Sequence, residues 1–250
     1  MENVNNGTFW EHLDVLRFAL LRSLIVVGAF SVLAFCFKDF VFDGIIFYPV
    51  KSDFFLFGLF DEIPDIKIIN TKLSAQLFIH LSVSFYLGLT VSVPYILGEI
   101  WFFLKPALYQ NERSMTVKAL VFMTLLFYCG VLVSYFLIFP LSVNFLANYQ
   151  VTSDVENLID LDSYIDTLTG LVLSLGLVFE LPVLAYFLSK IGILTHDFMK
   201  KRRKHAFVLV LILAAIITPS TDIFTLLLTA LPLQAVYELS AAVVKRNEKC

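Results

Sequence analysis

Apolar residues run in long stretches along this chain, and short polar segments separate them. An α-helix of about 20 apolar residues is long enough to cross the hydrocarbon core of a bilayer. We therefore predict an all-α, polytopic membrane protein with six transmembrane helices. The predicted spans cover residues 18–37, 73–95, 115–139, 164–188, 205–218 and 223–244.

The fifth predicted span is short, because only 14 residues separate Lys204 from Pro219. A helix of that length must thin the bilayer locally or lie against longer helices that shield its ends. The link between the fifth and sixth spans is also short, because it comprises only residues 219–222. The two spans are therefore predicted to form a tight helical hairpin.

The polar segment 94–113 lies between the second and third predicted spans. It combines several charged side chains with Trp101 and Tyr109, a mixture typical of the membrane–water interface. Pro106 should end or kink any helix that begins near Ile96. The segment thus predicts a short interfacial helix, a break, and a tight return to the next span.

The composition agrees with a membrane protein. Of the 250 residues, 59% are hydrophobic and 16% charged, and the mean hydropathy is +0.84, whereas a soluble domain carries about a quarter charged residues. Cys36, Cys129 and Cys250 do not indicate a disulfide or metal framework, and we expect no cofactor. The polar, slightly acidic N-terminal segment lacks a clear cleavage site, which argues against a removable signal peptide.

The basic residues are distributed unequally between the two sides of the membrane. With both termini on one side, that side receives 14 of the 18 Lys and Arg residues. Cytoplasmic loops carry the excess of Lys and Arg, so the termini and segment 94–113 are predicted to be cytoplasmic. The basic run 200–204 is typical of a topological anchor that faces anionic lipid.

The two longer external segments differ in character. Residues 38–72 contain prolines and aromatic clusters, and we predict that they pack as a cap across the outer face. Residues 154–162 contain four acidic residues and no basic one.

Glu180 lies in the middle of the fourth predicted span. A carboxyl group at that depth costs several kcal/mol unless it is protonated, paired or hydrated, so it is a candidate functional residue. The alternative is a protonated Glu180 that bonds a neighbouring helix for packing. Pro182 predicts a bend that would open a groove beside it.

The patterns of the common enzyme classes are missing from the sequence. Of the four histidines only His80 lies well inside a span, and there is no HExxH or GxSxG motif and no phosphate-binding loop. We predict a protein that is not an enzyme. In segment 94–113, however, Phe103, Pro106, Tyr109 and Glu112 recur at spacings of three, and an acidic site flanked by aromatic residues would suit a basic peptide.

Four separated motifs resemble the TatC family of twin-arginine translocase subunits. They are HLDVLR at residues 12–17, P-x6-W-x-F-x2-PALY-x2-ER at 94–113, FELP at 179–182 and TPSTDIFT-x6-P-x4-YE at 218–238. Their order and the six-span topology match the family, and the resemblance covers about residues 10–240, so the chain is expected to be a single TatC-like domain over residues 1–250.

The resemblance implies the receptor and core of a translocase that exports folded proteins across the bacterial inner membrane, driven by the proton-motive force. Its six helices would form a concave bundle. Its partners would be twin-arginine signal peptides, small single-span TatA- or TatB-like subunits and further copies of the complex, but no nucleic acid. The residues expected at the signal-peptide site are Asp14, Arg17, Pro94, Trp101, Phe103, Pro106, Tyr109, Glu112 and Arg113.

Within that site the resemblance assigns Glu112 to the arginines of the peptide and Phe103, Pro106 and Tyr109 to its framework. A guanidinium pairs well with a carboxylate, which agrees with this role. Glu180 would contact the single-span partners. The residues given structural or assembly roles are Pro182, Pro219, Asp222 and Glu238.

Two positions depart from the family pattern. Val15 stands where the first motif has a glutamate, and Asp14 is the first candidate to replace that carboxylate, with Glu11, one turn earlier, the second. Ser114 stands where a second basic residue commonly follows the Glu-Arg pair.

A small secondary transporter that uses Glu180 as a proton or cation site is the alternative. It predicts internal symmetry and paired broken helices, and the sequence shows neither clearly. An intramembrane protease is excluded because the sequence offers no nucleophile with its base.

Overall fold

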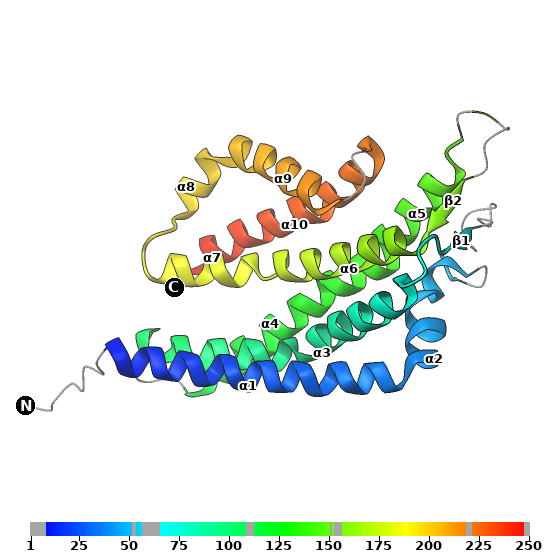
Figure 1. Cartoon of the computed structure of the whole chain (residues 1–250). Coiled ribbons are helices and arrows are strands. Elements are labelled where there is room, and N and C mark those ends of the chain that lie inside the picture. Colours follow the sequence, from blue (N-terminus) through cyan, green and yellow to red (C-terminus); the bar gives the residue numbers. More distant parts are fainter. Residues whose placement is uncertain are drawn as a thin grey trace, which may run out of the picture. The chain divides into compact units, whose positions relative to one another are not determined.

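The computed structural model describes residues 9–51, 54–56, 66–108, 113–150, 152, 157–218 and 222–247. These residues are almost entirely helical (Figure 1), which confirms the predicted all-α class apart from two strands of three residues each. The chain divides into two compact units. The first comprises residues 1–38 and 80–124, and the second comprises residues 39–79 and 125–250.

The first unit is built around two long helices, α1 (Phe9–Cys36) and α3 (Ala75–Leu108). They run antiparallel and in close contact: a Cβ atom added to Gly88 would lie 2.6 Å from the backbone nitrogen of Ser31. Further along, the rings of Phe35 and His80 stack with their centroids 4.0 Å apart. Small residues permit such close approach of helices in membranes, so Gly88 fixes the distance between α1 and α3.

Helix α3 corrects one prediction. It continues through Pro94 and Pro106 to Leu108, so the short interfacial helix predicted to begin near Ile96 and break at Pro106 is wrong. A proline removes one helical hydrogen bond, and helices in membranes tolerate that loss.

The second unit contains three long helical runs that contact one another: α4 with α5, α6 with α7, and α10. Helix α4 (Arg113–Val133), whose first part belongs to the first unit, passes through a π-helical turn (Ser134–Ile138) into α5 (Phe139–Asn148). It packs on α6 (Leu161–Val178), where a Cβ atom on Gly130 would lie 2.7 Å from the carbonyl oxygen of Leu175. The remaining helices are α7 (Leu181–Lys190), α8 (His196–Lys201), α9 (Arg203–Ile217) and α10 (Ile223–Asn247).

Helix α10 holds the last part of this unit together, because it packs along α7 and also contacts α8 and α9. Figure 1 shows α9 and α10 as a hairpin, as predicted. Helix α9 has 15 residues, or about 22 Å at 1.5 Å per residue, against a hydrocarbon core of about 30 Å. The helix is as short as predicted, and its role as a fifth span stays a prediction.

The segment that follows α1, which was predicted to be external, is packed. It forms a helical turn α2 (Lys38–Val41), a π-helical turn (Phe42–Ile46) and a 3-10 turn (Tyr48–Val50). The buried hydroxyl of Tyr164 donates to the carbonyl of Ile46 at 2.7 Å, and Phe54 is buried against Phe136. These contacts attach the segment to α6 and to the turn before α5.

Two short strands join this segment to the one before α6. Strand β1 (Lys67–Ile69) pairs in parallel with β2 (Leu158–Asp160). Next to the strands, Lys72 Nζ donates to Asp162 Oδ2 at 2.7 Å. This hydrogen bond is the main reason that the pKa of Lys72 is raised above its ordinary value.

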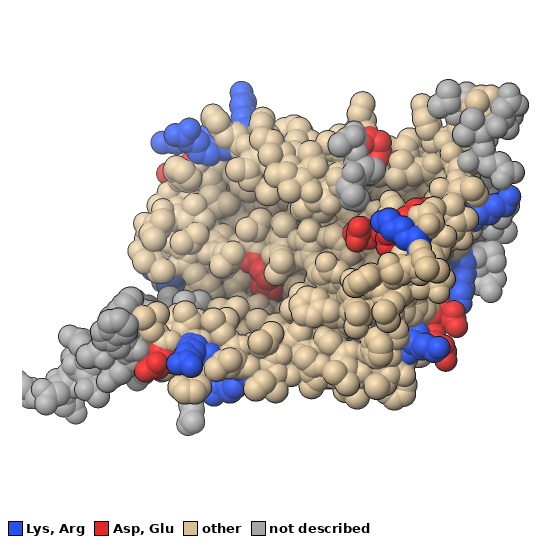
Figure 2. All heavy atoms as spheres, in the orientation of Figure 1, with Lys and Arg blue, Asp and Glu red and all other residues tan. Residues whose placement is uncertain are grey.

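Five helical runs among the described residues are long and apolar enough to cross a membrane: Leu13–Cys36, Ala75–Phe103, Leu120–Asn148, Leu161–Lys190 and Ile223–Asn247. Charged side chains occupy only small areas of the face shown in Figure 2. Together with the short helix α9, these runs match the predicted order of spans. Their bounds differ most in the second, which reaches Phe103 instead of Tyr95, and in the third, which reaches Asn148 instead of Phe139.

Candidate functional site

The first predicted site segment lies in the opening turns of α1. The side chains of Asp14, Val15 and Arg17 are all exposed, whereas Ala19 is buried. The exposed end of α1 therefore presents both an acidic and a basic group. Glu11 lies in the helix, but its side chain is outside the described residues.

The second predicted segment lies at the end of α3, in the same unit. Trp101 is buried, and Pro94 and Phe103 are half-buried. These three side chains thus form part of the packed wall of the first unit.

The other residues predicted for the signal-peptide site are only partly described. Pro106 is in α3 and Arg113 begins α4, without described side chains, while Tyr109 and Glu112 lie outside the described residues. The roles predicted for the signal-peptide residues stay predictions.

An ion pair that sequence reasoning did not foresee joins α1 and α3. Arg22 Nη2 donates to Glu99 Oε2 at 2.9 Å, and the hydroxyl of Tyr95 donates to Glu99 Oε1 at 2.8 Å. The side chain of Glu99 is 15% exposed and that of Arg22 57% exposed. A charged residue in the first predicted span, Arg22, and another in segment 94–113, Glu99, were the available signals, but the pairing depends on the register of two helices distant in sequence.

Glu180 lies at an interruption between α6 and α7. Helix α6 ends at Val178 because Pro182, four residues later, has no amide hydrogen to bond its carbonyl. The helix is therefore interrupted next to Pro182, and the bend and groove predicted there stay predictions. The Glu180 side chain is buried, and neither of its carboxylate oxygens has a hydrogen-bond partner among the described residues.

Asp222 caps the start of α10. The amide of Thr225 donates to Asp222 Oδ1 at 2.7 Å, and the Thr225 hydroxyl bonds the other carboxylate oxygen. Such a cap satisfies an amide that has no partner within the helix. The contact is consistent with the predicted structural role of Asp222, and Pro219 lies outside the described residues.

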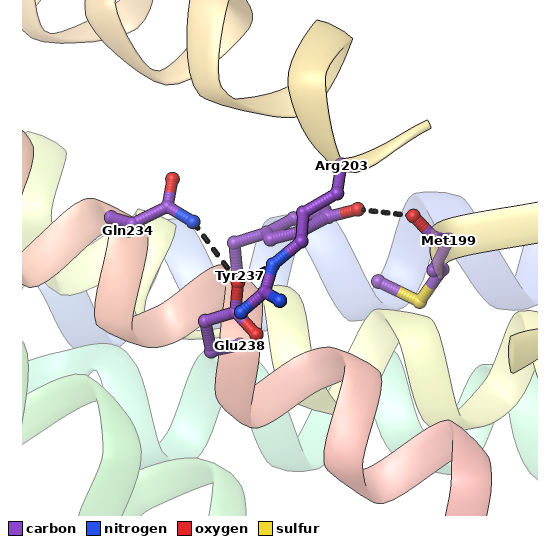
Figure 3. Close-up of polar contacts among 5 residues, drawn as sticks. All are labelled: Met199, Arg203, Gln234, Tyr237 and Glu238. Atoms are coloured by element: carbon purple, nitrogen blue, oxygen red, sulfur yellow. Dashed lines mark hydrogen bonds and ion pairs between the residues drawn. The ribbon is translucent and has the colours of Figure 1, made fainter. Parts of the chain in front are cut away.

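Glu238 belongs to a polar network between α10 and the start of α9 (Figure 3). Its Oε1 accepts from Arg203 Nε at 2.6 Å and from Gln234 Nε2 at 3.1 Å. Beside it the Tyr237 hydroxyl donates to the carbonyl of Met199 at 2.9 Å. The network ties α8, α9 and α10 together, and the structural or assembly role predicted for Glu238 stays a prediction.

The described residues contain no group of three or more His, Cys, Asp or Glu that could hold a metal ion. The chemistry that the arrangement offers is the binding of cations by carboxylates. Glu99 in the first unit lies within the apolar run Ala75–Phe103, and Glu180 in the second lies within the apolar run Leu161–Lys190.

Comparison with known proteins gives one consistent result. The profile of the family described as "Sec-independent protein translocase protein (TatC)" matches residues 11–232. The protein of that name from a Blattabacterium of Periplaneta americana is 35% identical, over 94% of each chain. The one from Aquifex aeolicus is 33% identical, over 92% of this chain and 91% of the relative.

Solved structures agree with the sequence comparison. A crystal structure of "Twin Arginine Translocase Receptor- TatC" matches with a TM-score of 0.80 and 32% identity, and the match covers 95% of this chain and all of that one. A second crystal structure, of the receptor in DDM, matches with a TM-score of 0.79 and 33% identity over 93% of this chain and 98% of that one.

Proposed function

We propose, since the chain belongs to the TatC family of Sec-independent protein translocase proteins, that it is the receptor and core subunit of a twin-arginine translocase. It is a multi-pass membrane protein and a component of a transport system, not an enzyme. The observation that carries the proposal is the match to a solved twin-arginine translocase receptor over 95% of this chain. The secondary transporter considered from Glu180 is disfavoured by this membership.

The proposed topology places the protein in the bacterial cytoplasmic membrane with both termini inside. It has six spans in a single membrane domain, of which α9 is the short fifth. The excess of basic residues, 14 of 18 on the side of the termini, supports this orientation. The exposed end of α1 and the end of α3 would then face the cytoplasm, where signal peptides arrive.

Glu112 is proposed to bind the arginines of the signal peptide. A carboxylate binds a guanidinium through charge-assisted hydrogen bonds and can accept two at once, which favours arginine over lysine. Phe103, Pro106 and Tyr109 would flank this contact. Phe103 is half-buried at the end of α3, where one side of its ring can support the peptide.

Capture of a peptide tests this function directly. Solubilised membranes that contain the full-length protein are incubated with an immobilised twin-arginine peptide or with the same peptide carrying two lysines. We expect retention on the arginine peptide only. Equal retention on both peptides, or on neither, would contradict the proposed receptor function.

Glu180 is proposed to contact small single-span partner subunits. Its carboxyl group is buried at a helix interruption and has no partner among the described residues. A polar side chain from a partner helix would lower the cost of that burial. Such a contact would favour a partner helix that carries a polar side chain at the level of Glu180.

Replacing Glu180 with alanine is therefore expected to spare peptide binding and to weaken partner association at least several-fold. Co-purification of the single-span subunits with the full-length variant measures the effect. Glu180→Gln, which keeps the shape and a hydrogen-bonding end, is expected to be intermediate. If Glu180→Ala instead abolished uptake of a small solute and left partner association unchanged, the transporter would be favoured.

A further inference from the structure

The Arg22–Glu99 pair offers a site for a guanidinium group within the first unit. Glu99 projects from α3 and holds one oxygen toward the Arg22 guanidinium at 2.9 Å and the other toward the Tyr95 hydroxyl at 2.8 Å. Both charged residues lie within runs that are apolar enough to cross a membrane. Ionisable residues in such positions commonly mark a path for a substrate or ion.

The two partners of Glu99 differ in how firmly they are held. Tyr95 lies one turn before Glu99 on the same helix, so it orients the carboxylate without help from α1. Arg22 reaches across from another helix, and its side chain is 57% exposed, against 15% for Glu99. The carboxylate is thus a fixed, mostly buried acceptor, whereas the guanidinium can be exchanged.

The pair also has a defined position relative to the exposed end of α1. Val15 and Arg22 are seven residues apart, which places them on the same face of the helix two turns from each other. A peptide that lies along this face would pass from the exposed Val15 side chain to Arg22 and Glu99. Asp14 is rotated by about 100° from Val15, away from that line.

A twin-arginine peptide carries two guanidinium groups, and Glu112 accounts for one carboxylate. We propose that Glu99 is the second guanidinium-binding carboxylate and that Arg22 competes with a peptide arginine for it. This inference rests on the proposed receptor function. One guanidinium replaces the other, so Glu99 stays paired throughout and no charge is left buried alone.

The experiment measures binding of fluorescent peptides to the full-length protein in detergent. The peptides carry Arg-Arg, Lys-Arg or Arg-Lys at the twin position. Glu99→Gln is expected to weaken binding of the Arg-Arg peptide about tenfold, as expected for loss of one charged hydrogen bond. It should also remove discrimination between Arg and Lys at one of the two positions and keep it at the other.

Arg22→Gln gives the opposite expectation, which loss of folding cannot imitate. Removal of the competitor is expected to tighten binding of the Arg-Arg peptide several-fold. Arg203→Gln serves as the matched control, because Arg203 forms the equivalent exposed pair with Glu238 in the second unit. It should leave peptide binding unchanged.

The outcomes separate the two proposals. If the unmodified protein does not prefer the Arg-Arg peptide, the receptor function fails and the inference fails with it. If it does prefer that peptide, but Glu99→Gln binds as well or Arg22→Gln binds less tightly, only the inference is overturned. A loss confined to Asp14→Asn or Glu11→Gln, tested in parallel, would place the second carboxylate on α1 and would likewise overturn it.

Discussion

Replacing Glu112 with alanine is expected to abolish binding of a twin-arginine peptide while the protein stays folded in the membrane. A carboxylate that bonds a guanidinium contributes about 1.5–3 kcal/mol, so its loss weakens binding by about tenfold to about 100-fold, which abolishes detectable binding at a peptide concentration near the Kd of the unmodified protein. Crosslinking of a labelled peptide to the full-length protein measures this loss.

Two variants make the result specific to Glu112. Asp197→Ala removes another exposed acidic residue, at the start of α8, and should leave crosslinking unchanged. Glu112→Gln keeps the shape but loses the charge, and should resemble Glu112→Ala. Unchanged crosslinking to Glu112→Ala would refute the assignment of this loop as the signal-peptide site.

The second large effect is expected at Gly88, where α1 and α3 are in backbone contact. A Cβ atom there would lie 2.6 Å from the backbone nitrogen of Ser31 and 2.8 Å from its Cα, so the two helices must separate. Such overpacking costs about 1–3 kcal/mol and sometimes more. Gly88→Ala should therefore lower the thermal unfolding temperature in detergent and weaken peptide binding.

Gly28 provides the matched control for this substitution. It lies in α1, and a Cβ atom added there would meet nothing within 4 Å. Gly28→Ala should be neutral or slightly stabilising, because alanine favours a helix by up to about 1 kcal/mol over glycine. Equal stability of the two variants would contradict the close packing of α1 against α3.

The positions and order of the long apolar helices were predictable from the sequence, but the interruptions within helices were predictable only in part. Apolar runs gave the helices and their order, because the bilayer thickness imposes a length on each span. Pro182 interrupts a helix and Pro106 does not, although both have the same chemistry. Pro94 and Pro232 also lie within the continuous helices α3 and α10, whereas Pro182 lies in the first turn of α7, after the break, so a proline alone does not predict where a helix is interrupted.

The candidate site was predictable where a single residue is unusual by itself. Glu180 is an acid in an apolar run, and its burial at a helix interruption agrees with that reading. The contact of Arg22 with Glu99 was not predictable, because it depends on which residues of α1 and α3 come level when the helices pack. That register is set by close contacts such as Gly88 with Ser31, which no local pattern encodes.

The pairing of β1 with β2 constrains the order in which parts of the protein can fold. Lys72 and Asp162, beside the strands, are 90 residues apart in the sequence, and α3, α4 and α5 lie between them. Since synthesis proceeds from the N-terminus, β1 must wait until the two apolar runs Ala75–Phe103 and Leu120–Asn148 have been made. The strands therefore pair late, only after the segment that begins α6 has been synthesised.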